Sequence, residues 1–506
     1  MGNMLPLYVA IPLGTAFVLP LLGKSKRLER LCDVVAVVAS TALLALVLTS
    51  LFEGGSATYW MGKWSETSII GISLVCDGLT RLLLVTVNLV SFLAIIFSVS
   101  YMKKYRSKGL YYCLFFVMIA GMNGVVLSGD MFNLYVFLEI AAVASYALVA
   151  FGCESEELEA SFKYLILGSV GSTFVLFGVG ILYNVTGTLN MAQIAQAVSG
   201  KANNAVLMAA SFFFMGFGLK AAMVPFHAWL PDAHPSAPAP ISAMLSGVLI
   251  KALGVYALCR VFFNVLGMSA PFATVLMTLG VGSMVVGVLL AVGQWDFKRL
   301  LAYHSISQMG YVVLALGVGG EMLVKGNSAL AGLAIFGGLF HLFNHAAFKS
   351  LLFLCSGAAE HGTGTRQLKE LGGLMHRMPV TSACCRVAAL SISGVPPFNG
   401  FWSKLIIIIA VVQAGHYALA AVTVAVSFLT LVSFVKVQRY VIQGELRSAL
   451  SSIREVPVLM CCAMVLLAII CLTAGVAVPV LRDVLLEPAR NVLLNGIEYA
   501  VVAMGG

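Results

Sequence analysis

Long apolar runs, separated by short polar segments, repeat along the whole chain. Each run holds about 19 to 29 residues, and a helix of that length crosses the ~30 Å hydrocarbon layer of a membrane. The runs predict fourteen membrane-spanning helices near residues 4–22, 31–52, 79–102, 110–128, 131–152, 162–184, 205–230, 238–262, 272–293, 300–320, 328–356, 383–411, 417–442 and 457–481. The last stretch, 483–506, is too interrupted for a further span, and we expect it to form a surface segment.

The composition agrees with this class. Of 506 residues, 60% are apolar and 10% are charged, and the mean hydropathy is +0.99. Soluble proteins carry about a quarter charged residues, so lipid must solvate most of this surface. The net charge of +9 lies in short loops without a continuous basic stripe, which argues against a nucleic-acid partner. The eleven cysteines include no C-x-x-C pair, so we expect no metal and no cofactor.

Basic residues divide unequally between the two sets of loops. Loops after odd-numbered spans, with the helix ends beside them, hold 18 Lys and Arg residues, including Lys26, Arg27 and Arg106. Loops after even-numbered spans hold four: Lys63, Lys201, Arg260 and Lys325. Because cytoplasmic loops are enriched in Lys and Arg, we expect a multi-pass protein of the cell (inner or plasma) membrane with both termini on the outer side.

Five charged residues lie inside predicted spans, far from either end: Glu139, Lys220, Lys251, Lys349 and Lys404. A charge at mid-bilayer costs about 2.5–3.5 kcal/mol on insertion scales, so such residues usually face a protein interior or a wet cavity and mark an ion path. Arg81 and Arg386 lie early in their spans, where a long side chain can reach the headgroups. The five central residues are therefore the candidate site.

Glu139 is the natural partner of Lys220, because it is the carboxylate near the middle of the early spans. Burial disfavours the charged form of a lysine, and a nearby carboxylate restores it. A lysine whose carboxylate approaches and withdraws is a proton site of adjustable affinity. The sequence thus predicts a carboxylate–lysine pair that handles protons.

His341, His345 and Lys349 follow one another at intervals of four residues, which places them on one face of a helix. The His-x3-His spacing also occurs in zinc proteases, but the intervening Glu is missing and the lysine opposes metal binding. Imidazole titrates near pH 6.5, so we interpret this face as a proton relay.

Two spans contain helix breakers beside a buried lysine. Pro225 follows Lys220, and Pro396 and Pro397 precede Lys404, and proline within a helix removes a hydrogen bond and bends or breaks it. The two spans are the seventh and the twelfth, so they cross in opposite directions. Inverted repeats with interrupted helices place ion sites at mid-membrane.

Together these residues resemble the antiporter-like subunits shared by Mrp-type sodium/proton antiporters, respiratory complex I and membrane-bound hydrogenases. The motifs that carry the resemblance are Leu134–Glu139 (LYVFLE), Lys220–Pro235 (KAAMVPFHAWLPDAHP), Ala239–Ala243 (APISA) with Lys251, Gln294–Gly310 (QWDFKRLLAYHSISQMG), His341–Lys349 and Gly394–Lys404. A lysine at position 404, where another complex I member carries a glutamate, favours the D-type component of the Mrp antiporters.

The resemblance implies an all-α integral membrane protein with two inverted five-helix repeats. The expected units are residues 1–109 (flanking helices), 110–265 (first repeat), 266–445 (second repeat) and 446–506 (helix 14 and tail). It implies that Lys251 joins the His341, His345 and Lys349 face in a central hydrophilic axis, and that Lys404 is the terminal exchange residue. The secondary residues of the motifs are His227, His234, Asp296, Lys298 and His304.

The implied function is movement of H+ through this Glu/Lys/His relay. The chain would act in the lipid bilayer, as part of a complex with other membrane subunits. Whether Na+ also passes is left open, as is the type of complex: a Na+/H+ antiporter, a hydrogenase, or a complex I-type oxidoreductase of NADH or ferredoxin. A structural scaffold subunit without ion flux is a further alternative. We expect no catalytic redox centre in this chain.

Overall fold

The computed structural model describes residues 2–24, 28–52, 54–63, 71–105, 107–199 and 203–504. Four basic residues from the loop count, Lys26, Arg27, Arg106 and Lys201, lie outside the described residues.

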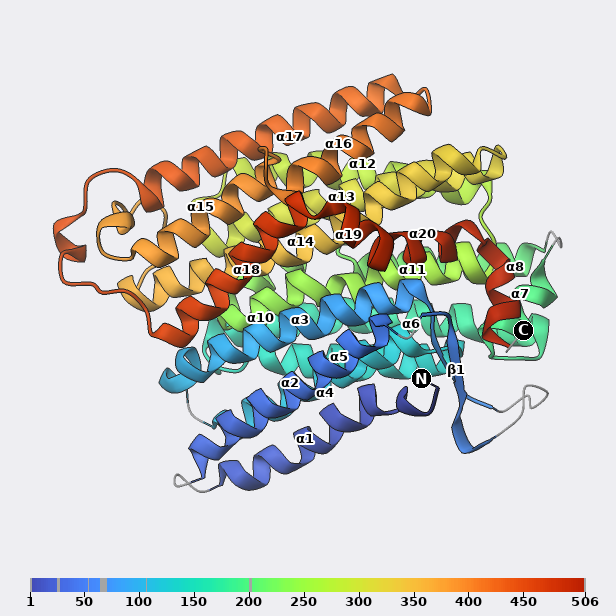
Figure 1. The fold of residues 1–506 in the computed structure, drawn as a ribbon, viewed down its shortest axis with the longest axis horizontal. Coiled ribbons are helices and arrows are strands. Elements are labelled where there is room, and N and C mark those ends of the chain that lie inside the picture. Colours follow the sequence, from blue (N-terminus) through green and yellow to red (C-terminus); the bar gives the residue numbers. More distant parts are fainter. Residues whose placement is uncertain are drawn as a thin grey trace.

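Long helices that run alongside one another build the molecule (Figure 1). In the described part of the chain, twelve are long and apolar enough to cross a membrane. They are α1 (Leu7–Gly23), α2 (Glu29–Phe52), α3 (Gly78–Tyr101), α4 (Lys108–Leu127), α5 (Met131–Val149), α6 (Ser155–Thr186), a composite helix over 239–265, α12 (Ala270–Val292), α13 (Phe297–Val324), α14 (Ser328–Thr363), α17 (Tyr417–Val437) and α18 (Val458–Val476). Each coincides with a predicted span, so the all-α membrane class is confirmed.

The two remaining spans are interrupted, as their prolines predict. The seventh consists of α8 (Asn204–Lys220) and α9 (Leu230–Ser236), and the twelfth of α15 (Pro379–Ser393) and α16 (Asn399–Gln413). Gly394 ends α15 with a φ of 76°, a left-handed cap that glycine adopts without strain. The peptide bonds before Pro225 and Pro397 are both cis. The first break thus lies next to Lys220, and the second lies about one and a half turns before Lys404.

The composite helix fills the centre of the bundle, and the membrane-spanning window within it is fully buried. It consists of α10 (Ala239–Met244), the π-helical turns η4 (Leu245–Leu249) and η5 (Lys251–Tyr256), α11 (Ala257–Cys259) and the π-helical turn η6 (Arg260–Val265). π-Helical turns inside helices often accompany functional sites. Here one of them begins at Lys251.

Three features differ from the expectation. Helix α6 begins at Ser155, seven residues earlier than predicted, because the acidic residues before the apolar run form its first turns, where the helix dipole favours them. Strands β1 (Ala57–Trp60) and β2 (Ser73–Cys76) form an antiparallel pair that the apolar pattern did not predict. The tail is helical and packs on α3 and α14 through α20 (Glu487–Leu494), with Leu493 buried.

The shorter elements complete the chain. They are η1 (Gly2–Met4), η2 (Met61–Lys63), η3 (Met102–Lys104), α7 (Met191–Val198), η7 (Leu374–His376), η8 (Gln438–Ile442), η9 (Ser448–Leu450), α19 (Val478–Leu481), η10 (Arg482–Leu486), η11 (Gly496–Glu498) and α21 (Tyr499–Ala503).

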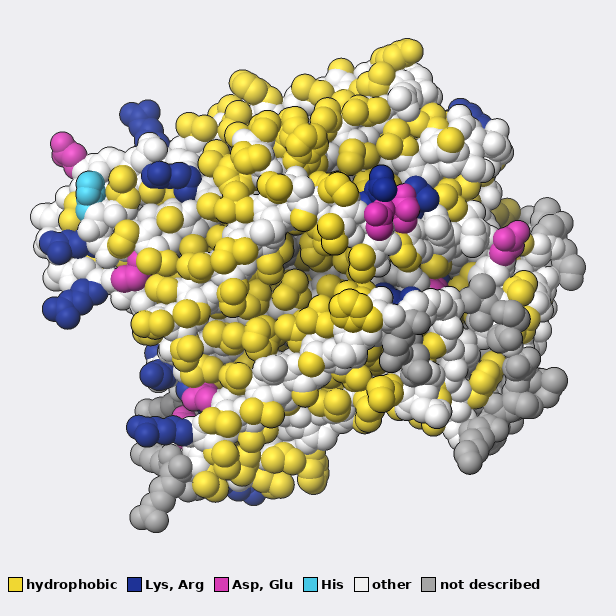
Figure 2. All heavy atoms as spheres, viewed as in Figure 1, with side chains coloured by type: hydrophobic (Ala, Val, Ile, Leu, Met, Phe, Trp, Pro, Cys, Tyr) yellow, Lys and Arg dark blue, Asp and Glu magenta, His cyan; other side chains and the backbone are white. Residues whose placement is uncertain are grey.

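The surface shows how the bundle meets lipid. Apolar side chains cover the middle of the visible face, and Lys and Arg side chains gather at its left end (Figure 2). The N- and C-termini both lie toward the other end (Figure 1). An apolar middle beside a basic end is what a membrane-spanning bundle requires.

Candidate functional site

Lys220 and Glu139 form an ion pair beside the first helix break. Lys220 ends α8, its side chain is 3% exposed, and its Nζ lies 3.6 Å from Glu139 Oε1 on α5. The Ser172 hydroxyl on α6 donates a hydrogen bond to the same carboxylate oxygen. Glu139 is 29% exposed, so one partner is enclosed and the other reaches the surface of the chain. The geometry brings the predicted pair together.

Aromatic side chains build the wall around this pair. Lys220 Nζ donates to the hydroxyl of Tyr146 at 3.2 Å. Tyr146 meets the ring of Tyr164 edge-on at 4.4 Å, and Tyr164 stacks on Trp229 from the break at 4.0 Å. Trp229 Nε1 in turn donates to the carbonyl of Leu219. The indole thereby satisfies a backbone group near the end of α8 and holds the break against the pair.

Lys251, at the start of η5, and Lys349, on α14, are both fully buried. Lys251 Nζ donates to the carbonyls of Ser246 at 2.7 Å and Gly247 at 2.5 Å. Lys349 Nζ donates to the carbonyl of Leu301 on α13. Backbone oxygens of the neighbouring turns therefore solvate both ammonium positions.

The first pair is close to this centre because Gly254, in the same π-helical turn as Lys251, packs on Ala221. A Cβ at Gly254 would lie 2.5 Å from the Cα of Ala221, the residue after Lys220. The absence of a side chain at position 254 thus lets the composite helix approach the broken helix.

His341 and His345 extend the centre toward the second break. His341 Nδ1 lies 2.9 Å from Ser403 Oγ and its Nε2 lies 3.2 Å from Gln308 Oε1. Ser403 precedes Lys404, whose Nζ donates to the carbonyl of Ile392 at 2.8 Å. Tyr311 lies between the predicted face of α14 and the predicted terminal lysine: its ring centroid is 5.5 Å from that of His341 and 5.0 Å from Lys404 Nζ.

Lys404 is 3% exposed and has neutral partners. Besides the carbonyl in the broken helix, its Nζ donates to Ser427 Oγ at 3.3 Å and lies 5.0 Å from the ring centroid of Tyr311. Within the described residues, Lys220 is the one of the four central lysines that pairs with a carboxylate.

The secondary residues lie at separate places in the bundle. His227 lies in the first break. His304, on α13, has its Nε2 2.8 Å from Ser433 Oγ on α17. Asp296 caps α13 through the N–H of Arg299. Lys298 and His234 lie at the end of the central axis and are buried.

Several ring nitrogens of these histidines have no hydrogen-bond partner among the residues that the structure describes. They are His227 Nδ1, both nitrogens of His234, His304 Nδ1 and both nitrogens of His345. Buried polar groups are nearly always hydrogen-bonded, and internal water satisfies those that the protein does not. Five of these six atoms belong to His234, His304 and His345, which are fully buried, and each is a place where internal water can bind.

Neutral residues of the site were missed by the sequence reasoning: Tyr146, Ser172, Gln308, Ser403 and Ser427. Each contacts a predicted residue, as described above. Ser and Thr in apolar helices commonly bond the carbonyl four residues earlier, so their presence in a span carries little signal. Gln308 lies within the Gln294–Gly310 motif, and a polar amide inside an apolar span was the clearest sequence sign that a neutral residue belongs to the site.

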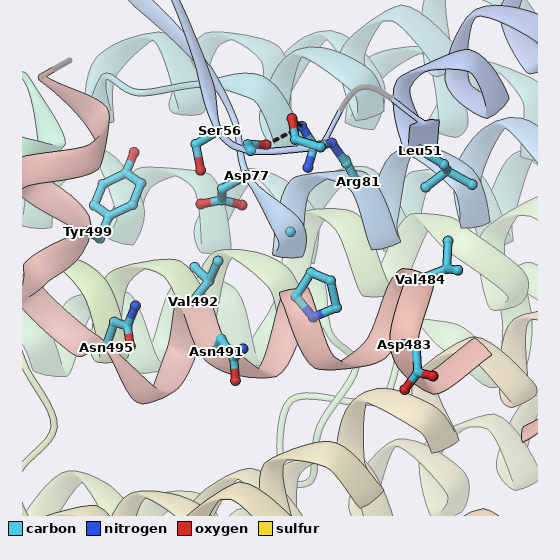
Figure 3. Close-up of a pocket in the computed structure, with 14 residues that line it drawn as sticks. Leu51, Ser56, Asp77, Arg81, Asp483, Val484, Asn491, Val492, Asn495 and Tyr499 are labelled. Carbon is cyan, nitrogen blue, oxygen red and sulfur yellow. Dashed lines mark hydrogen bonds between the residues drawn. The ribbon is translucent and has the colours of Figure 1, made fainter. Parts of the chain in front are cut away.

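A cavity of about 480 Å³ lies away from this axis, between the ends of α2 and α3 and the C-terminal helices (Figure 3). Asp77, Arg81 and Tyr499 line it, and none of the predicted site residues does. Arg81 does not reach outward as expected: it is 8% exposed, and its Nη2 donates to the carbonyls of Gly54 and Gly55.

Known families match most of this chain. The family described as NADH:quinone oxidoreductase/Mrp antiporter, TM, matches residues 128–430. A second, described as NADH-Ubiquinone oxidoreductase (complex I), chain 5 N-terminus, matches residues 63–112. The first match covers more than half of the chain and all of the central residues, and it confirms the resemblance that the motifs indicated.

Individual proteins are similar over nearly the full length. The D component of the Na(+)/H(+) antiporter of Alkalihalophilus pseudofirmus is 34% identical over 88% of each chain. The N component of the NADH-quinone oxidoreductase of Desulforudis audaxviator is 38% identical over 80% of this chain and 79% of that protein. A chain of the Mrp complex from Dietzia sp. DQ12-45-1b has a TM-score of 0.89 and 28% identity, covering 100% of this chain and 99% of the other.

Proposed function

The chain belongs to the NADH:quinone oxidoreductase/Mrp antiporter family, and we propose that it moves protons along the axis from the Glu139–Lys220 pair to Lys404. The observation that carries the proposal is a series of buried charged and imidazole groups. They lie at the first helix break, at the centre and beside the second break, and Lys251, Lys349, His345, His341 and Lys404 are near enough to interact electrostatically. A buried series of that kind opposes insertion into lipid, and proton conduction explains why it is kept.

The residues have distinct roles in this proposal. Glu139 adjusts the proton affinity of Lys220. At the centre, Lys251 and Lys349 pass the proton on. His345 and His341 then carry it to Lys404. We assign the first repeat to residues 110–265 and the second to 266–445, with flanking helices in 1–109 and helix 14 and the tail in 446–506.

We place the protein in the cell membrane with the basic loops in the cytoplasm and both termini outside. The count of basic residues in the two sets of loops supports this orientation, as does the gathering of Lys and Arg at one end of the visible face (Figure 2). Cysteine labelling of each terminus with an impermeant reagent in intact cells tests it.

Two kinds of complex remain as the setting. The D component of the antiporter and the N component of the quinone oxidoreductase are similar to this chain at comparable identity, and we favour the D type because position 404 is lysine. Gentle purification with an iron assay separates them: iron-free membrane partners indicate an Mrp-type antiporter, and iron-rich soluble partners indicate a redox-driven pump. The same relay serves either setting.

Flux measurements on the assembled complex test the proton path. Lys220→Ala and Glu139→Ala should abolish proton movement in everted membrane vesicles, read with a pH-sensitive dye, while the complex still co-purifies. Lys163→Ala is the matched control, because Lys163 is also ion-paired to carboxylates but is 47% exposed. Wild-type flux in both test variants would refute the proposal and favour a scaffold without ion flux.

A further inference from the structure

The polar face of α14 continues beyond Lys349 toward the end of the molecule that carries the basic loops. Ser356 and Glu360 follow Lys349 by seven and eleven residues. At 3.6 residues per turn, both lie within about 20° of the direction of Lys349, and Glu360 is about 16 Å further along the axis. The stripe that begins at His341 therefore reaches the end of the helix at a carboxylate.

Two side chains from other helices line the gap between Lys349 and Glu360. His234, from α9, stacks on Phe353 with ring centroids 4.5 Å apart, and Lys349 Nζ lies 5.5 Å from the centroid of the same ring. Lys298, from α13, has its Nζ 2.9 Å from Glu360 Oε2. The Phe353 ring thus contacts both His234 and Lys349, and the Lys298–Glu360 ion pair lies further toward the end of α14.

Three polar atoms in this gap lack a partner in the described part of the chain. Ser356 Oγ and both ring nitrogens of His234 are buried and make no hydrogen bond to any described residue. These are three unsatisfied polar atoms between two charged groups, in a stretch where a dry core would hold apolar side chains. Such atoms are satisfied by internal water, and water between titratable groups carries protons.

Glu360 is the partly exposed member of the stripe, with 22% of its side chain accessible. Arg366, whose Nη1 lies 3.9 Å from Glu360 Oε1, also lines a polar cavity of about 550 Å³. Arg366 and Asp296 line that cavity and form an ion pair at 2.5 Å. Three cations face Glu360: Lys298 on α13, Arg366 in the following loop and Lys104 in η3.

We infer that Glu360 is the entrance through which protons pass between the polar cavity and the central relay. In one direction, the carboxylate takes a proton from water in the cavity and gives it, across water held by Ser356 and His234, to the amine of Lys349. In the other direction the same groups act in reverse. The inference rests on the proposed function, since it supplies that relay with its opening to one side.

A purely structural ion pair with Lys298 is the competing explanation, and two variants separate it from an entrance. Glu360→Gln keeps the size and hydrogen bonding but carries no proton, whereas Glu360→Asp keeps the carboxylate. If Glu360 is the entrance, Glu360→Gln slows proton flux by about 100-fold, the lower end of what a positioned proton-transfer group contributes. Glu360→Asp should recover most of it. A structural role predicts that both variants act mainly on assembly.

The experiment uses the complete complex in everted vesicles, with co-purification of partners as the measure of assembly. Glu321→Gln is the matched control: Glu321 is ion-paired to Lys325 and is 17% exposed, but it lies at the opposite end of α13 from Lys298, so flux should stay at the wild-type level. Formate added on the side of the basic loops should restore flux to Glu360→Gln, because a small weak acid can replace the missing proton carrier at an open entrance.

Wild-type flux in an assembled Glu360→Gln complex overturns the inference, and so does equal loss in Glu360→Gln and Glu360→Asp. If Glu360→Gln does not assemble, Ser356→Ala decides, because this hydroxyl makes no bond to the protein: slowed flux supports the path, and unchanged flux overturns it. Lys404→Ala is measured alongside. If it too leaves flux unchanged, the proposed function has failed; if it abolishes flux, only the entrance is in question.

Discussion

Asp77 and Arg260 form the most completely buried ion pair of the described chain, and removing one charge should destabilise the fold strongly. Asp77 Oδ2 lies 2.8 Å from Arg260 Nη1, and its Oδ1 accepts a hydrogen bond from Nη2 at 3.0 Å. Both side chains are at most 2% exposed. The guanidinium also lies 4.6 Å from the ring centroid of Tyr499, so the pair joins α3 and the composite helix to the tail. Figure 3 shows Asp77 and Tyr499 at the wall of the 480 Å³ cavity described above.

Asp77→Asn isolates the charge, because asparagine can still accept the N–H of Thr80 that caps α3. The variant leaves the arginine buried without its counter-ion. Removing one partner of a buried pair costs about 3–5 kcal/mol, whereas an exposed pair contributes about 0–1 kcal/mol. The loss should exceed the effect of the same substitution on a surface pair several-fold.

The pH dependence of this effect has a defined sign. Burial would raise the pKa of Asp77, but the Arg260 charge and the hydrogen bonds from Arg260 and Thr80 outweigh it and hold the pKa below its ordinary value. The stabilisation is therefore fully present above the unfolded-state pKa of about 3.9 and is lost as the pH falls through the lower folded-state value. The difference between wild type and Asp77→Asn should be constant from pH 5 to 8, a range that lies wholly above that unfolded-state pKa.

Titration with a denaturing detergent in mixed micelles, followed by tryptophan fluorescence, measures the free energy of unfolding. Asp483→Asn is the control, since Asp483 lies 2.8 Å from Arg482 but both are more than half exposed. Adding Arg260→Met to Asp77→Asn should recover stability by removing the orphaned cation. The reasoning is wrong if Asp77→Asn unfolds like wild type, or if the double variant is less stable than the single one.

Two further substitutions test other parts of the fold. Burial raises the pKa of Asp130 to about 6, so Asp130→Asn should be more stable than wild type above pH 6 by about 1–3 kcal/mol. This gain in stability should vanish below the unfolded-state pKa of about 3.9. Equal gains at pH 4 and pH 8 would contradict the prediction. A Cβ at Gly400 would overlap the carbonyl of Ser391, so Gly400→Ala should cost about 1–3 kcal/mol and reduce proton flux by displacing the break that anchors Lys404. Gly282→Ala is its control, because a Cβ there meets nothing within 4 Å, and the same unfolding and flux assays apply.

The spans were predictable because lipid imposes a length on apolar runs that water does not. The breaks were predictable because proline excludes a regular helix, as at Pro225 and Pro397. The start of α6 was not, since the acidic residues from Glu154 to Glu159 read as a loop although they suit a helix N-terminus. The β1–β2 pair was missed because four-residue strands between spans leave no periodic signal.

The charged residues of the site were predictable for an energetic reason: an ionisable group within a span is too costly to be incidental. The neutral residues that connect them were not, because Ser403 or Tyr146 is compatible with an ordinary span. Glu360 was missed for a different reason. It lies at the end of α14, where a carboxylate is unremarkable, and only its spacing from Lys349 and Ser356 reveals that it continues the polar face.

The lysines of the proposed relay differ in what holds them, and we expect this difference to decide where a change in proton occupancy begins. Lys404 and Lys251 are held by carbonyl and hydroxyl oxygens fixed in the helices around them. Lys220 is held by a carboxylate that is 29% exposed at the surface of the chain. A neighbouring protein packed on α5 and α6 would change the surroundings of Glu139 directly, while the oxygens around the other lysines stay in place. We therefore expect partner binding to act first on the Glu139–Lys220 pair, and variants that weaken the contact with a partner to resemble Glu139→Ala in flux.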